Sequence, residues 1–167
     1  MILLVPIEEL RKAGVVARMY SLQDVSLAEF AARRSAPYSR DPTVRMQLKT
    51  SADASHDLAT DQQSVSVAVR FEVLASGPAS PDPLVTVSGV FALDYSRAVK
   101  EGEVEPSGVA AFARINGPYN AWPYIREVVA AAFGRMGYPR LTLEPLIVNP
   151  KPTEALRPPK KKAPKGS

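Results

Sequence analysis

The chain of 167 residues contains no cysteine and a single histidine. The absence of cysteine excludes disulfides, thiolate metal ligands and cysteine nucleophiles. His56 has no second imidazole or thiolate with which to share a metal ion, so we expect no metal site and no cofactor. It sits between Ser55 and Asp57, but neighbours in sequence do not aim at one another as a catalytic triad requires. We therefore expect that the protein is not an enzyme.

Glycine is scarce, and its nine residues all occur singly. None follows the strand–glycine–helix order that phosphate binding requires. Long hydrophobic runs are also missing, because no apolar stretch approaches the length of a membrane span. The first ten residues meet Pro6 and two acids too soon for a signal peptide. These features predict a cytoplasmic protein without membrane insertion.

The two ends of the chain differ from the middle. Residues 1–13 fit one helical face interrupted by Pro6, which predicts a short docking helix or an irregular arm that ends at Gly14. Residues 150–167 hold six basic side chains and one acid, whereas residues 1–149 hold 15 basic and 16 acidic side chains. The net charge of +4 therefore belongs to the tail. Because the tail is rich in proline and poor in apolar residues, we expect residues 149–167 to be disordered.

Apolar residues at every second position indicate β-strands in three stretches. In residues 64–74, five apolar side chains in succession point one way. Residues 85–95 repeat the pattern after a proline-rich turn, so the two stretches are predicted to form a long antiparallel hairpin. Residues 43–49 alternate as well, and their apolar face consists of Val44, Met46 and Leu48.

The stretches around these strands are less regular. Residues 15–30 are predicted to be extended, with an irregularity at Gln23 and Asp24. Residues 31–42 contain two prolines and are predicted to form a loop. The polar residues 50–63 are predicted to form a turn.

A long amphipathic helix is predicted to begin near Trp122, because Asn120 can cap it and Pro123 suits an early helical position. Residues 96–108 are expected to be irregular, and residues 109–115 a short apolar approach to the helix. Apolar residues then recur at helical spacing, at Ile125, Val128, Val129, Ala132, Phe133 and Met136. Gly137 and Pro139 end the helix, and residues 141–146 are predicted to be extended.

Residues 122–145 resemble the SecB family of export chaperones. The resemblance is carried by the run Trp-Pro-Tyr-Ile-Arg-Glu at 122–127, by Arg135, and by Pro-Arg-Leu-Thr-Leu-Glu-Pro at 139–145. Weaker similarity extends back to about Val16, and Tyr20 to Ser26 resembles the Tyr-x-x-Asp-Ile-Ser motif with one residue added. The resemblance implies an α+β fold with a four-stranded antiparallel sheet and one long helix, in a domain spanning residues 14–148.

The resemblance also implies a function. SecB proteins are ATP-independent holdases, homotetramers built as dimers of dimers, and they bind non-native chains in apolar grooves. The resemblance implies that the client-binding residues are Val44, Met46, Leu48, Tyr38 and Trp122. It also implies that Ile125, Val129, Phe133 and Met136 make the contacts between subunits. Asp24 matches one acidic residue used to dock the translocase motor SecA, whereas two further glutamate positions are Leu84 and Ala28 here.

The chain also departs from the family, because it lacks a second helix after the leucine-rich segment and has a basic end. These features resemble the divergent SecB-like chaperones of toxin–antitoxin systems, whose client is an antitoxin segment. Two alternatives remain open. One is an assembly module that recognises a single folded partner. The other is a nucleic-acid-associated protein that uses the basic tail, although the rest of the chain has no aromatic platform for bases.

Overall fold

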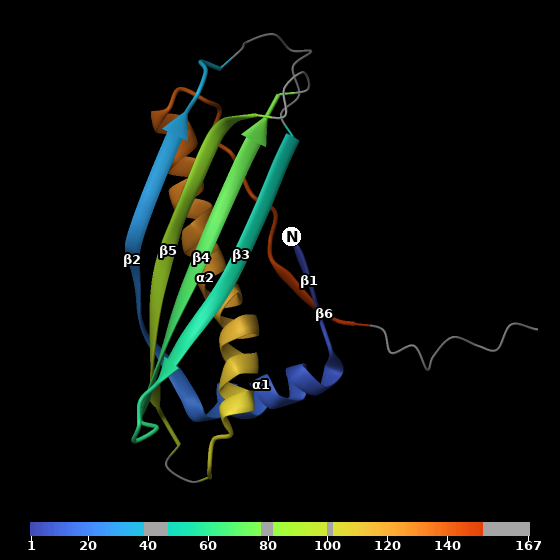
Figure 1. Ribbon diagram of the computed structural model, residues 1–167, viewed down its shortest axis with the longest axis vertical. Coiled ribbons are helices and arrows are strands. Elements are labelled where there is room, and N and C mark those ends of the chain that lie inside the picture. Colours follow the sequence, from blue (N-terminus) through green and yellow to red (C-terminus); the bar gives the residue numbers. More distant parts are fainter. Residues whose placement is uncertain (39–46, 78–81, 100–101, 152–167) are drawn as a thin grey trace, which may run out of the picture.

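The computed structural model describes residues 1–38, 47–77, 82–99 and 102–151. Four antiparallel strands form the main sheet: β2 (Tyr20–Arg34), β3 (Gln47–Leu58), β4 (Ser64–Ser76) and β5 (Pro83–Arg97). Their order is β2-β5-β4-β3, so β4 and β5 are central and β2 and β3 are the edges. Figure 1 shows that the long helix α2 (Pro106–Arg135) lies across one face of this sheet. The predicted α+β fold is confirmed.

The core lies between α2 and the two central strands. The odd-numbered residues from Val65 to Ala75 in β4 are buried, and so are those from Val85 to Tyr95 in β5. Apart from Gly89, their exposure is 0–3%. This is the face that the alternating pattern predicted. The helix comes close to β4, since a Cβ on Gly117 would lie 2.8 Å from Val67 Cγ1. A glycine at this position allows α2 to sit directly on the sheet.

The helix α2 begins 16 residues before Trp122, at Pro106, so the prediction of its start was wrong. Gly108, Gly117 and Pro118 hide the helical pattern of its first half, although all three are buried and helical. The predicted end is correct to within two residues: Arg135 is the last helical residue, and Gly137 takes a φ of 81°. Packing against the sheet therefore overrides the low helix propensity of these residues.

The edge strands also differ from the predictions. The polar residues 50–58 are not a turn, because they continue β3 and pair with β4 throughout. The strand β2 begins at Tyr20 rather than Val15 and extends to Arg34. Its pairing with β5 shifts register between Leu22 and Asp24, where an irregularity was predicted. A second shift lies between Leu27 and Glu29.

The N-terminal arm contains a strand and a longer helix than predicted. The strand β1 (Ile2–Val5) precedes the helix α1 (Ile7–Met19), which continues through Gly14. The strand β1 pairs in parallel with β6 (Ile147–Pro150). Asn149 and Pro150 are therefore strand residues rather than part of a disordered tail. The predicted disorder of residues 152–167 lies outside the described residues.

Among the described residues, no helix has the length and apolar character needed to cross a membrane.

Candidate functional site

The edge strand β2 presents a row of exposed apolar side chains on the face that carries α2. Leu22, Leu27 and Phe30 are 39%, 43% and 45% exposed, although their partners across the sheet lie on the core face of β5. A cavity of about 330 Å³ separates the end of this row from the second half of α2. Its lining includes Leu27, Phe30, Glu127, Val128, Arg135 and Met136. We call the β2 side chains Leu22, Leu27 and Phe30 the edge row.

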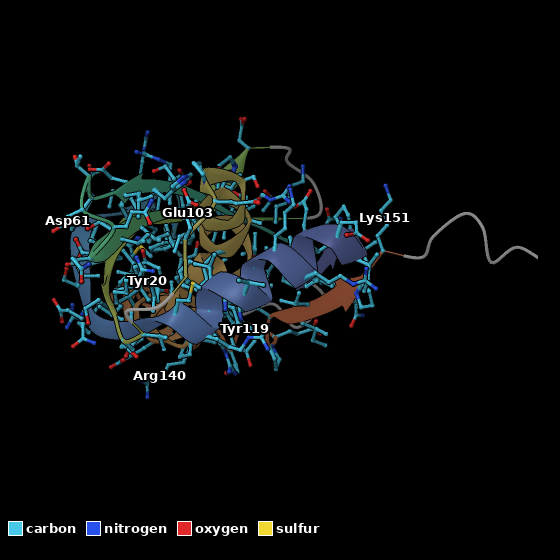
Figure 2. All side chains as sticks on the ribbon, turned by 90° about the horizontal axis from the view of Figure 1, so that it is seen from below. Tyr20, Asp61, Glu103, Tyr119, Arg140 and Lys151 are labelled. Atoms are coloured by element: carbon cyan, nitrogen blue, oxygen red, sulfur yellow. The ribbon has the colours of Figure 1, made fainter. Side chains whose placement is uncertain are left out.

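A second cavity, of about 400 Å³, includes Leu22 and the middle of α2. Tyr119 and Tyr124 contribute to its lining and are 56% and 42% exposed. The ring of Tyr124 lies 6.0 Å from the ring of Phe91 on β5, and Tyr119 lies at the surface of the molecule (Figure 2). Aromatic rings left half-exposed beside an apolar strand are typical of surfaces that bind another polypeptide.

The predicted client residues Tyr38 and Leu48 are both exposed, at 37% and 43%. The ring of Tyr38 packs edge-on against Tyr138, with 5.3 Å between ring centres. The Tyr138 hydroxyl donates a hydrogen bond of 2.7 Å to the carbonyl of Ala36, and burial raises the pKa of Tyr138, partly opposed by the charge of Arg34. Tyr138 thus anchors the chain just after β2. Val44 and Met46 lie outside the described residues.

Trp122 contributes to the lining of the second cavity but is almost completely buried. It is only 4% exposed, and its Nε1 donates a hydrogen bond of 2.8 Å to the carbonyl of Glu144. The indole therefore fastens the segment after α2 to the helix, and its contact with a client stays a prediction. A buried indole needs such an acceptor, which explains why the ring turns inward.

Three of the four residues predicted to contact another subunit lie in the core of the same chain. Ile125, Val129 and Phe133 are 0% exposed because this stripe of α2 packs on the sheet below it. Met136 is half-buried and lines the cavity beside β2. Contacts between helices of different subunits would have to use the opposite face of α2, where exposed residues recur at Tyr119, Pro123, Glu127 and Gly134.

The edge row was not predicted from the sequence, and the reason is structural. The two register shifts in β2 change which residues share a face, so Leu22, Leu27 and Phe30 do not follow a simple period of two. Asp24 lies on the other face of the sheet, exposed and opposite Asp94. The Asp94 carboxylate accepts a hydrogen bond of 2.7 Å from Ser66 Oγ. In the part of the chain that the structure describes, no group of three or more His, Asp or Glu could hold a metal ion.

Comparison with known proteins identifies relatives of this fold. The family described as SecB, preprotein translocase subunit SecB, matches residues 8–149. The SecB-like chaperone Rv1957 of Mycobacterium tuberculosis, solved in complex with a ChAD peptide from the HigA1 antitoxin, has a similar structure with a TM-score of 0.69. It shares 22% identity, and the match covers 83% of this chain and 98% of that chain.

A protein of unknown function from Streptococcus agalactiae gives a TM-score of 0.35 at 11% identity, covering 75% of this chain and 96% of that chain. That similarity is too low to support an argument. No curated protein matches the sequence at a significant level.

Proposed function

The chain belongs to the SecB family, and we propose on this basis that it is a cytoplasmic chaperone that holds non-native polypeptide segments without ATP. The observation that carries the proposal is that Tyr38 and Leu48, which flank the connection between β2 and β3, are left exposed at 37% and 43%. An apolar surface of this kind binds extended chains through side-chain burial and needs no bound nucleotide.

We place the client surface at the residues that flank the connection between β2 and β3. Tyr38 and Leu48 are the exposed apolar residues of this region in the described part of the chain, and Val44 and Met46 belong to the same proposal. Leu48→Ser should remove roughly 1–2 kcal/mol of apolar contact with a client, a loss of about five- to thirtyfold in affinity. Titration with a permanently unfolded protein measures this loss.

The control is Val99→Ser, since Val99 is 44% exposed but lies after β5, outside the proposed surface. It should leave the affinity unchanged. The urea midpoints of both variants should stay close to that of the unaltered chain. An affinity that is equally reduced by both substitutions would argue against a defined client surface.

We propose further that a second copy of the chain covers the edge row. Among the described residues, β2 is an edge strand of 15 residues, and an edge strand with exposed apolar side chains is a template for pairing with another strand. Two such pairs would form the dimer of dimers of a homotetramer through the exposed face of α2. Because Met136 lines the cavity beside β2, it is the one predicted interface residue that keeps this role.

Leu27→Asp tests this interface, because it places a charge in the middle of the edge row. Sedimentation should show a smaller assembly, with the urea midpoint changed little at low protein concentration. Val99→Asp, an equally exposed position, should leave the assembly intact. An unchanged mass for Leu27→Asp would remove the edge row from the interface.

The client of this chain is proposed to be an antitoxin segment or a preprotein. The antitoxin peptide bound by the Mycobacterium tuberculosis relative supports the first of these. Suppression of the aggregation of unrelated proteins would indicate a general holdase, whereas binding restricted to one antitoxin would indicate a dedicated one. Docking of SecA at the exposed Asp24 stays a prediction, to be tested by Asp24→Asn in a binding assay with the motor.

A further inference from the structure

The segment that follows α2 lies in the protein as an extended chain. We call residues 139–148 the strap. Figure 1 shows the chain turning back at the end of α2 and running beside the helix to β6. Arg140 lies near Gly134, and the carbonyl of Glu144 accepts a hydrogen bond from Trp122. The strap therefore runs antiparallel to the helix. Leu141, Leu143 and Leu146 are turned toward the core, and Thr142, Glu144 and Pro145 between them are exposed.

Regular backbone pairing holds the strap only at its end. Residues 139–146 belong to no strand, and pairing begins at Ile147, where β6 meets β1. The amides of Ile147 and Lys151 donate to the carbonyls of Met1 and Val5, at 3.0 and 2.7 Å. The amino group of Met1 donates to the carbonyl of Pro145 at 3.1 Å. The strap is thus clamped by the first five residues of the chain.

The clamp formed by β1 and β6 is expected to have a low stability of its own. It consists of two paired strands of four residues each, and a ribbon of two short strands is marginally stable in water. Ile2 and Leu4 are 62% and 58% exposed, so one face of the ribbon is uncovered within the chain. The match to the SecB family begins at residue 8, so β1 lies outside the region of family similarity. Opening of the clamp needs no change in the main sheet.

The strap also adjoins the proposed client surface. Tyr138, immediately before the strap, packs against Tyr38, one of the proposed client residues. A client lying over Tyr38 could continue into the space of the strap. The strap itself has the chemistry of a client, because it is extended and turns three leucines inward, at positions 141, 143 and 146.

We propose that the strap is an internal occupant of the client groove, and that the N-terminal strand β1 controls access to the groove by clamping the strap in place. A client with alternating apolar residues displaces the strap once the ribbon of β1 and β6 opens. This inference rests on the proposed chaperone function and adds to it a regulated site. The apparent affinity for a client is then reduced by the fraction of molecules in which the strap is closed.

Because the chain has no cysteine, a disulfide can lock the clamp cleanly. Leu4 and Asn149 are partners in register on the exposed side of the ribbon, so Leu4→Cys combined with Asn149→Cys places two thiols opposite each other. The probe is an unstructured peptide with leucine at every second position, and its control carries serine in their place. The oxidised variant should bind the leucine peptide at least about tenfold more weakly than the same variant after reduction.

Hydrogen exchange on the unaltered chain gives an independent measurement. A saturating amount of the leucine peptide should accelerate exchange at the amides of Ile147 and Lys151, while the amides of the central strand β4 keep their protection. Equal binding by the oxidised and reduced variant, or unchanged exchange at these two amides, would overturn the clamp and leave the chaperone function standing. Failure of the unaltered chain to bind any unfolded polypeptide would overturn the proposed function and the clamp with it.

Discussion

The central strands and the edge strand β2 carry the same kind of side chain and bury it to different extents. Phe71 on β4 is 1% exposed, and Phe30 on β2 is 45% exposed. The two residues lie on the same face of the sheet and both adjoin Gly89 of β5. The difference arises because α2 lies over the central strands and leaves a cavity beside β2. Burial is therefore decided by what covers a strand and not by its own pattern.

The comparison separates two uses of apolar surface. Side chains under α2 stabilise the single chain, since they leave water when the protomer folds. Side chains of the edge row stay partly in water in the single chain, and we propose that another polypeptide covers them. If this division holds, substitutions in the first group should change the free energy of unfolding, and those in the second should change assembly.

The largest effect is expected from the matched pair Phe71→Ala and Phe30→Ala. Loss of the buried ring should cost about 3–5 kcal/mol, whereas loss of the half-exposed ring should cost less than about 1 kcal/mol at low protein concentration. Urea unfolding of both variants measures this difference. Similar costs at low concentration would show that Phe30 already belongs to the core of the single chain.

Gly89→Ala should break the contact between the two regions. A Cβ at this position would lie 2.5 Å from the carbonyl oxygen of Glu29 and 2.9 Å from the ring of Phe71, so β2 and β4 would both have to shift. The expected cost is about 1–3 kcal/mol. Gly14→Ala is the control, because its Cβ meets nothing within 4 Å inside α1 and should stabilise the helix by up to about 1 kcal/mol. Thermal unfolding of the two variants should shift in opposite directions.

The smallest effect is expected at high pH, in the central strand β5. Burial raises the pKa of the Tyr95 hydroxyl, although the hydrogen bond of 2.9 Å donated by Asn120 Nδ2 opposes the shift. Because the folded pKa is above the ordinary value of about 10, stability is complete below pH 10 and falls as the pH rises through the folded value. Tyr95→Phe should make this fall shallower. It should not abolish the fall, since burial also raises the pKa of Tyr20 and Tyr138. An identical pH profile for the variant would contradict the assignment.

Much of the fold could be predicted because two patterns are strong. The five apolar residues from Val65 to Val73 allowed β4 to be placed to within two residues, and β5 followed from the same argument. The stripe from Ile125 to Phe133 indicated the second half of α2 and its buried face. In these elements, the apolar face that the sequence pattern predicts is the face that packs in the core.

The errors concern elements whose side chains are small, polar or interrupted. Residues 50–58 have the composition of a turn, yet β4 provides them with a complete partner strand, and their small side chains leave room for α2. The apolar stripe of α2 was identified correctly, but sequence alone does not show that the sheet of the same chain lies beneath it. The burial of Trp122 could not be predicted for a similar reason, since the carbonyl that accepts its hydrogen bond belongs to Glu144, 22 residues further along the chain.

The sequence by itself determined the family, the central hairpin and the amphipathic half of α2, because each depends on residues close together in the chain. Only the tertiary structure decided which apolar surfaces are left uncovered. The edge row depends on two register shifts between β2 and β5. The clamp on the strap depends on a pairing between Ile2 and Ile147, two residues at opposite ends of the described chain. Exposure is a property of what packs against a residue, and distant segments supply those neighbours.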